Sequence, residues 1–160
     1  MSGAYRIESA NQGLPVRPRR PGEPGSVVII WERIGGPFPD PDLWTFEPSP
    51  EPAGAYYIVN AAAALVIGIE APVAAGAGLQ LEERKREPGQ LWRFEAVPNQ
   101  PGSYYIASAA MGLVIGATQP LAPGTQLHAV ERTLEADQWW TVLTSAGAPA
   151  QPPAVQAAAG

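Results

Sequence analysis

Apolar positions in residues 55–96 alternate with polar or small ones in short runs. Three segments show this alternation, namely 55-AYYIVN-60, 78-GLQLEE-83 and 91-LWRFEA-96. A period of two is typical of β-strands that bury one face. A fourth segment, 64-ALVIG-68, is continuously apolar, and Gly, Pro and Asn residues between the segments favour turns. The pattern therefore predicts four short strands.

The same pattern occurs three times along the chain. The stretch 102-GSYYIASAAMGLVIG-116 is a near copy of 54-GAYYIVNAAAALVIG-68, and a shorter match begins at Gly3. In each copy the Ile of the tyrosine strand is followed by a Leu seven residues later, by a Gly eleven residues after that, and then by a Trp. These landmarks are Ile7, Leu14, Gly25 and Trp44; Ile58, Leu65, Gly76 and Trp92; and Ile106, Leu113, Gly124 and Trp140. The shared register predicts an internal threefold repeat.

Three units of four strands favour an all-β fold of the β-trefoil kind. One unit of roughly 45 residues cannot bury its apolar face alone, and propellers typically need about four to eight blades. Three units that close on themselves predict a six-stranded barrel capped by three hairpins, with pseudo-threefold symmetry. The units cover about residues 3–48, 54–98 and 102–145, and are called units one, two and three below.

The domain is expected to span residues 1–145. Residues 146–160 carry no charge, no alternation and no counterpart in the repeats. Their Ala- and Pro-rich composition predicts a flexible tail.

The repeated aromatic and aliphatic residues are expected to form the core. Each closing Trp is predicted to fill the inside of the barrel, and the tyrosine strands and the repeated Leu are predicted to pack in the same core. The residues concerned are Trp44, Trp92 and Trp140, the pairs Tyr57/Ile58 and Tyr105/Ile106, and Leu14, Leu65 and Leu113.

Composition narrows the possible partners. The formal net charge is −5, which disfavours nucleic acid as a partner because phosphate contacts need a basic face. The chain has no Cys, which excludes disulfides and favours a reducing compartment. No apolar run approaches the roughly 18 residues of a membrane span, and the N-terminus lacks the apolar segment of a signal peptide. We therefore expect a monomer without a membrane partner, either cytoplasmic or secreted without a signal peptide.

Signs of catalysis are absent from the sequence. His128 is the single His, and no nucleophile elbow, phosphate-binding loop or dinucleotide fingerprint occurs. The acids in 39-PDPD-42 are close together but more typical of a turn than of an acid–base pair. The sequence thus predicts a binding protein rather than an enzyme, with no cofactor and no metal.

The Q-x-W triplets 90-QLW-92 and 138-QWW-140 resemble those of the ricin-B-type β-trefoil lectins. In that family an Asp at the end of G-L-x-[IV]-D holds the hydroxyls of the sugar. The aligned positions here are Arg17, Gly68 and Gly116. The chain therefore keeps the scaffold residues of these lectins and lacks their sugar-binding Asp in all three units.

Trp31 is the one candidate for the aromatic that stacks on the sugar in those lectins. Units two and three have Glu82 and Val130 at the equivalent position. A carbohydrate site around Trp31 needs an acidic or amide group beside it, and Asp40 or Asp42 on the insertion of unit one are the candidates.

Unit one is also similar to the mushroom serine-protease inhibitors, the family of cospin and cnispin. The similarity rests on 15-PVRP-18 and 44-WTFEP-48, and covers mainly residues 3–48. It implies a disulfide-free β-trefoil that presents an inhibitory residue on an exposed loop. That loop follows the second strand in some members and joins the last two strands in others.

Both loops carry arginine, which trypsin-like proteases bind in a deep pocket. The first loop offers Arg17, Pro18, Arg19, Arg20 and Pro21, and the second offers Arg132 and Thr133. Proline restricts the backbone, and a loop held in an extended shape binds at a lower entropy cost. Arg19 is the preferred contact because the next residue is not Pro. A solvated polar loop is the alternative interpretation of the same residues.

The main functional prediction is a serine-protease inhibitor that binds a trypsin-like protease non-covalently, in a substrate-like way. The first alternative is a ricin-B-like carbohydrate-binding module with Trp31 as its stacking residue. Two others are a cysteine-protease inhibitor of the mycocypin kind, which shares the fold, and a β-trefoil without a ligand.

Overall fold

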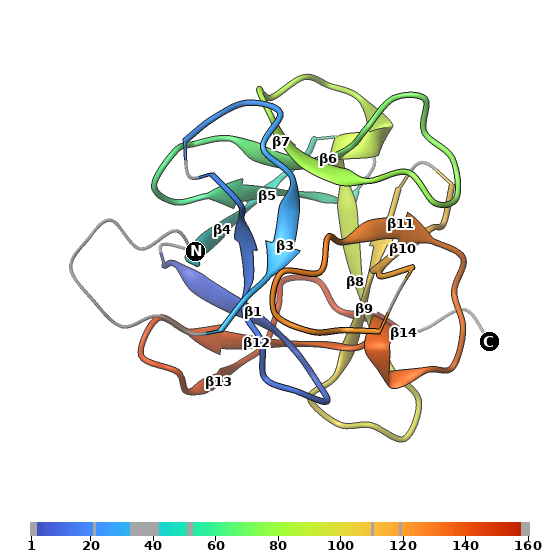
Figure 1. Ribbon diagram of the computed structural model, residues 1–160. Coiled ribbons are helices and arrows are strands. Elements are labelled where there is room, and N and C mark those ends of the chain that lie inside the picture. Colours follow the sequence, from blue (N-terminus) through green and yellow to red (C-terminus); the bar gives the residue numbers. More distant parts are fainter. Residues whose placement is uncertain are drawn as a thin grey trace.

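Six strands of the computed structural model form a closed antiparallel barrel (Figure 1). The structure describes residues 3–20, 22–32, 42–50, 53–109, 111–118 and 120–157. The barrel strands are β1 (Tyr5–Ser9), β4 (Trp44–Pro48), β5 (Tyr56–Asn60), β8 (Trp92–Ala96), β9 (Tyr104–Ser108) and β12 (Trp140–Thr144). Each pairs with the next in this order, and β12 pairs with β1, which closes the ring.

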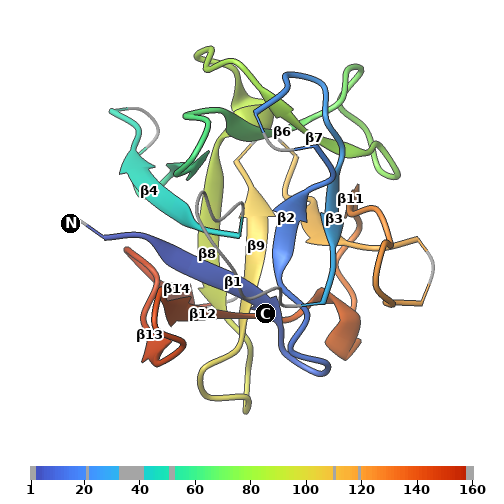
Figure 2. The same ribbon diagram turned by 60° about the vertical axis from the view of Figure 1, so that its left-hand side comes forward.

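The other strands of the repeats form three hairpins. They are β2 (Val16–Pro18) with β3 (Val28–Ile30), β6 (Val66–Ile69) with β7 (Leu79–Glu82), and β10 (Val114–Gly116) with β11 (His128–Val130). Figure 2 shows β2, β3, β7 and β11 on the side of the molecule away from β4 and β13. A barrel of six strands with three hairpins is a β-trefoil, so the predicted fold is confirmed.

A glycine from each unit joins its hairpin to the next one. The φ angles of these glycines are +86°, +91° and +93°, a region that favours glycine over residues with a side chain. Each donates its backbone N–H to a carbonyl of a neighbouring hairpin at 2.7 Å. The pairs are Gly25 with Leu81, Gly76 with Ala129 and Gly124 with Ile30. The repeated Gly of the sequence is therefore the residue that links the hairpins in a ring.

The closing Trp of each unit lies fully buried in the main core, as predicted. Each indole N–H donates a hydrogen bond of 3.0 Å to a carbonyl at the start of a hairpin, so its one polar atom is satisfied. The pairs are Trp44 with Val16, Trp92 with Ile67 and Trp140 with Ile115.

The prediction that the tyrosines share this core is wrong. Ile58 and Ile106 belong to the main cluster, whereas Tyr57 and Tyr105 lie in two smaller clusters. Successive residues of a strand point to opposite faces, so a Tyr and the Ile after it cannot both face the barrel interior.

The segment after the third unit runs back along the barrel. The short strands β13 (Pro149–Ala150) and β14 (Gln156–Ala157) pair with β12 and β8. Pro152 is buried and Val155 packs against the main core. Its composition gives no strand signal, and the flexibility of this tail stays a prediction.

The described residues contain two short 3-10 helices, η1 (Pro88–Gln90) and η2 (Ala136–Gln138). Neither these nor any other described segment forms a helix with the length and apolar character to cross a membrane.

Candidate functional site

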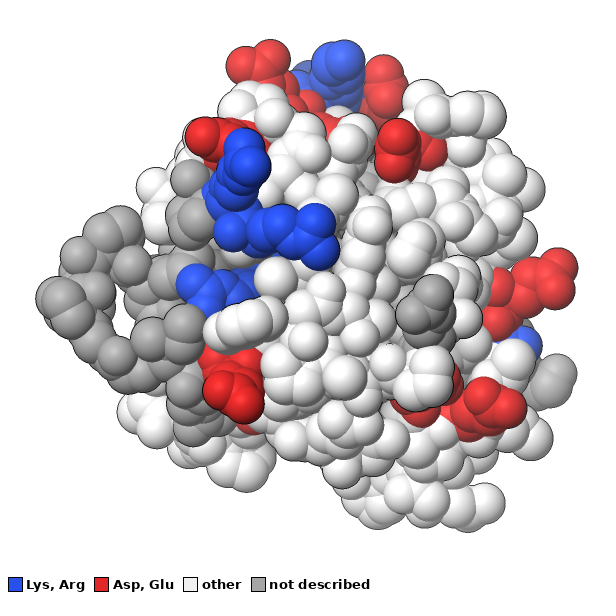
Figure 3. Space-filling model, viewed as in Figure 1, with Lys and Arg blue, Asp and Glu red and all other residues white. Residues whose placement is uncertain are grey.

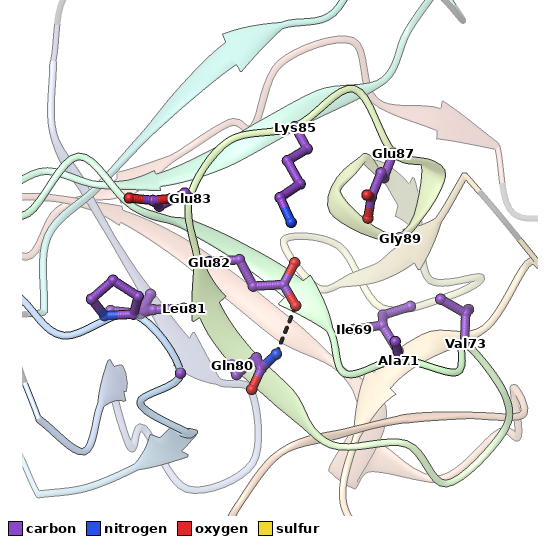
Figure 4. Close-up of a pocket in the computed structure, with 12 residues that line it drawn as sticks. Ile69, Ala71, Val73, Gln80, Leu81, Glu82, Glu83, Lys85, Glu87 and Gly89 are labelled. Carbon is purple, nitrogen blue, oxygen red and sulfur yellow. Dashed lines mark hydrogen bonds between the residues drawn. The ribbon is translucent and has the colours of Figure 1, made fainter.

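A polar pocket of about 440 Å³ opens beside the hairpin of unit two (Figure 4). This volume lies in the range of about 300–1,000 Å³ typical of small-ligand sites. One side is apolar, with Ile69 and Val73, and the other carries Gln80, Glu82 and Lys85. A pocket with one apolar wall and several hydrogen-bonding groups suits a ligand with an apolar face and many hydroxyls.

The carboxylate of Glu82 points into this pocket (Figure 4). Its Oε2 accepts a hydrogen bond from Nε2 of Gln80 at 2.8 Å, and its Oε1 accepts one from Nε2 of Gln90 at 2.9 Å. A carboxylate offers roughly four acceptor positions. Two amides therefore fix its orientation, and each oxygen keeps a lone pair for a ligand.

Glu82 fills the space beside Gly68, the position at which the resemblance to lectins places a sugar-binding Asp. A Cβ added to Gly68 would overlap Oε1 and Cδ of Glu82 and would lie 3.0 Å from Oε2. The two residues lie on paired strands, β6 and β7. Unit two therefore has a carboxylate near the missing Asp, supplied by the other strand of the hairpin, which the sequence analysis missed.

Unit three does not share this arrangement. A Cβ on Gly116 would lie 2.7 Å from Cγ2 of Val130 and 3.2 Å from Cγ of Gln138. The residue equivalent to Glu82 is thus apolar and offers no acceptor for a hydroxyl.

The Gln of each Q-x-W triplet closes the loop before it. Oε1 of Gln90 accepts a hydrogen bond from the N–H of Lys85, and Nε2 donates to the carbonyl of Glu83. Gln138 makes the same pair of contacts, with Thr133 and Glu131. These residues support the loops rather than meeting a ligand.

Asp42 occupies the equivalent position in unit one, and its predicted role beside a sugar at the surface is wrong. It is 1% exposed, with Oδ1 at 3.4 Å from Nε of Arg17 and Oδ2 at 3.9 Å from a terminal nitrogen of Arg6. A buried charge needs charged partners, and these arginines supply them. Asp40, the other candidate, lies outside the described residues.

Trp31 itself is exposed, with 38% of its surface open, as a stacking residue requires. It lines a second pocket of about 410 Å³ together with Arg17, Arg19, Ile29 and Gly124. Among the described residues the charged groups of this pocket are cationic, whereas the resemblance to lectins predicts an acid beside Trp31.

The residues of the first predicted protease-binding loop are only partly available. Arg17 lies in strand β2 and is paired with Asp42, and Pro18 is buried. Arg19 and Arg20 are exposed. The backbone N–H of Arg19 bonds to the carbonyl of Val27, and that of Arg20 bonds to Oγ of Ser26. Pro21 lies outside the described residues.

The second predicted loop is held against the barrel. The guanidinium of Arg132 lies 4.5 Å from the ring centre of Tyr105, and its Nη2 lies 2.7 Å from Oε1 of Glu95. The carbonyl of Thr133 accepts a hydrogen bond from the hydroxyl of Tyr105. These contacts occupy the side chain that a protease pocket would need.

Unit two repeats this cluster with Arg84, Tyr57 and Glu47. A signal was present, because each Glu precedes its Arg by 37 residues in both copies. The cluster joins each unit to the preceding one.

Within the described part of the chain no three His, Cys, Asp or Glu residues lie close enough together to hold a metal ion.

The sequence matches a known protein family. The family described as ricin-type beta-trefoil lectin domain-like matches residues 40–130, more than half of the chain. The chain belongs to this family. A comparison with curated proteins gives no match. The resemblance to ricin-B-type lectins is therefore confirmed, and nothing in the comparisons supports the resemblance to protease inhibitors.

Solved structures with low sequence identity share the fold. The designed threefold-symmetric protein ThreeFoil has a TM-score of 0.78 and 18% identity, over 89% of this chain and 99% of ThreeFoil. A Macrolepiota procera ricin B-like lectin, solved with lactose, has a TM-score of 0.73 and 19% identity, over 90% and 98%. The Clostridium thermocellum exo-beta-1,3-galactanase 1,3Gal43A has a TM-score of 0.80 and 16% identity, over 90% of this chain but 30% of that chain. Such likeness establishes the fold alone.

Proposed function

We propose that this chain is a carbohydrate-binding module that binds without catalysis. The observation that carries the proposal is the Glu82 carboxylate, which stands in the space beside Gly68 and points into the pocket of unit two. Membership of the ricin-type family and the lactose complex of the Macrolepiota procera lectin support the same ligand class.

The pocket has the groups that a sugar ring requires. The oriented carboxylate of Glu82 accepts hydrogen bonds from neighbouring hydroxyls, and bonds to a charged acceptor are about twice as strong as neutral ones. Ile69 and Val73 offer an apolar surface to the C–H face of the ring. Lys85 lines the same pocket and supplies a donor.

Binding to an array of neutral oligosaccharides tests the proposal, followed by calorimetric titration of the strongest ligand. The Glu82→Gln variant should bind that ligand at least about tenfold more weakly, because it loses a charged acceptor. Glu131→Gln is the matched control, since the exposed Glu131 contributes only its backbone carbonyl to the described contacts. Equal binding by both variants would show that the site is wrong. The absence of binding to any neutral glycan by the folded protein would overturn the function proposed for this pocket.

Inhibition of serine proteases has no support from the family or from the relatives. It stays a prediction that rests on Arg19 and Arg20, the two exposed arginines of the first loop. Inhibition of cysteine proteases likewise gains no support. Titration of trypsin and papain activity with the purified protein tests both.

A further inference from the structure

The pocket beside Trp31 is opposite in charge to the pocket of unit two. Arg17 and Arg19 line it, and no carboxylate does so among the described residues. Figure 3 shows basic side chains gathered on the face that carries β3, with acidic side chains above and below them, although the whole chain has a net charge of −5. A local basic surface on an acidic protein attracts an anion to one place.

Asp42 does not cancel this charge. It lies beside both Arg6 and Arg17, so its single negative charge is shared between two guanidiniums. Arg19 adds a further cation to the pocket. The side chain of Arg19 has no hydrogen bond or ion pair with any described residue, and its guanidinium can turn to a ligand. Asp42 instead holds Arg17 in place at the edge of the pocket.

Trp31 is held in a fixed position. Its backbone N–H bonds to the carbonyl of Pro15 at 3.1 Å. Its ring lies against Gly124, where a Cβ would stand 3.2 Å from Cζ3 of the indole. The ring is therefore packed on the backbone of a neighbouring hairpin, and binding does not have to order it. An exposed, fixed indole suits the apolar face of a sugar ring.

We infer that the pocket of Trp31, Arg17 and Arg19 binds a sugar residue that carries a negative group, either a carboxylate or a sulfate ester. The indole contacts the ring of the sugar, and the two guanidiniums contact its anion. The inference rests on the proposed carbohydrate binding, and adds a second ligand class at a site separate from Glu82.

The experiment compares neutral glycans with their sialylated, uronic-acid and sulfated counterparts on one array. The salt concentration is about 150 mM, which is close to physiological ionic strength. The strongest acidic ligand is then titrated beside the same glycan without its acidic group. We expect the acidic form to bind at least about tenfold more tightly. The sialylated and uronic-acid arms report a carboxylate, and the sulfated arm reports a sulfate.

The variants separate the pocket from the general charge of the surface. Arg19→Gln should lose most of the preference for the acidic glycan. Arg20→Gln removes the same charge from the next residue, which is exposed and does not line the pocket, and should keep the preference. Circular dichroism checks that both variants are folded.

Each outcome decides between the proposals. Equal binding of acidic and neutral glycans overturns the inference and leaves the carbohydrate function in place. Equal loss in Arg19→Gln and Arg20→Gln also overturns it, because general charge would explain the preference. Binding of acidic glycans alone, lost in Arg19→Gln, supports the inference and removes the Glu82 site. The absence of all glycan binding removes both.

Discussion

Oδ1 of Asp42 lies 3.4 Å from Nε of Arg17, in the place where the other two units have Gln90 and Gln138. The glutamines close the loops before the barrel Trp through backbone contacts. The Asp instead pairs with arginines of the first two strands, including Arg6. The insertion of unit one thus coincides with a change from a neutral loop support to a buried ionic one, which fixes Arg17 beside Trp31.

Replacement of Asp42 by Ala should strongly destabilise the fold. The change leaves two largely buried guanidiniums without their shared carboxylate, and removal of one partner of a buried pair costs about 3–5 kcal/mol. Urea unfolding measures the free energy. Glu47→Ala is the control, since its pair with Arg84 is nearly half exposed and should contribute less than about 1 kcal/mol. Similar losses in both variants would contradict the structural role of Asp42.

Replacement of Gly68 by Ala should weaken neutral-sugar binding more than it weakens the fold. The new Cβ would overlap the Glu82 carboxylate, which is the far end of a flexible side chain and can move away. We expect a loss of about 1 kcal/mol in unfolding free energy and a loss of most binding to the neutral glycan. Calorimetry and urea unfolding measure the two effects. Unchanged binding would show that the position of Glu82 does not matter.

The fold could be predicted because the residues that build it are repeated. Trp44, Trp92 and Trp140 and the three linking glycines have the same role in every unit, so the spacing carries the symmetry. Tyr57 and Tyr105 lie outside the main core because each is the strand neighbour of an Ile that faces the barrel interior. The alternation itself predicts that the two tyrosines point away from that interior.

The candidate sites were harder to predict because they depend on contacts between residues that are far apart or break the repeat. Gly68 stands where the lectin pattern has an Asp, so the sequence indicates that an acid is missing. Glu82 occupies the space beside Gly68 only because β6 pairs with β7. Asp42 looks like an exposed turn residue in a Pro-rich insertion, and its burial follows from the arginines that surround it. The positive charge of the Trp31 pocket likewise depends on the folded chain, which brings Arg17 and Arg19 beside Trp31.

Removal of the tail should reveal how firmly it is bound. A chain that ends at Ser145 loses the contacts of Ala150 and Val155 with the core and the pairing of β13 and β14. The loss of this partly buried apolar surface should lower the unfolding free energy by about 1–3 kcal/mol. Urea unfolding of both chains measures it. Equal stability would support the flexible tail that composition predicts.

Replacement of Arg132 by Ala should lower the stability of the fold. It should not change the result of a trypsin inhibition assay. The side chain loses its contact with Tyr105 and its pair with Glu95, which are largely buried, at a cost of about 1–2 kcal/mol. Thermal unfolding measures the change, with Arg86→Ala as an exposed control. A trypsin titration completes the test, because loss of inhibition in this variant alone would restore Arg132 as a protease contact.

Ala substitutions at two glycines with the same backbone role distinguish an effect on fold stability from an effect on ligand binding at the Trp31 pocket. Gly76 and Gly124 have φ angles of +91° and +93° and both donate to a neighbouring hairpin. Ala at either position should cost about 1–2 kcal/mol, since a side chain is strained there. Only the Cβ at Gly124 meets Trp31, whereas that at Gly76 meets open space.

The Gly124→Ala variant should therefore lose affinity for acidic glycans, because the indole must shift away from its packing position. Gly76→Ala should keep that affinity at the same loss of stability. Calorimetry with the strongest acidic ligand, at a temperature where both variants are folded, measures the difference. If both variants lose affinity together, the effect comes from the weakened ring of hairpins, and the position of Trp31 is not what the ligand requires.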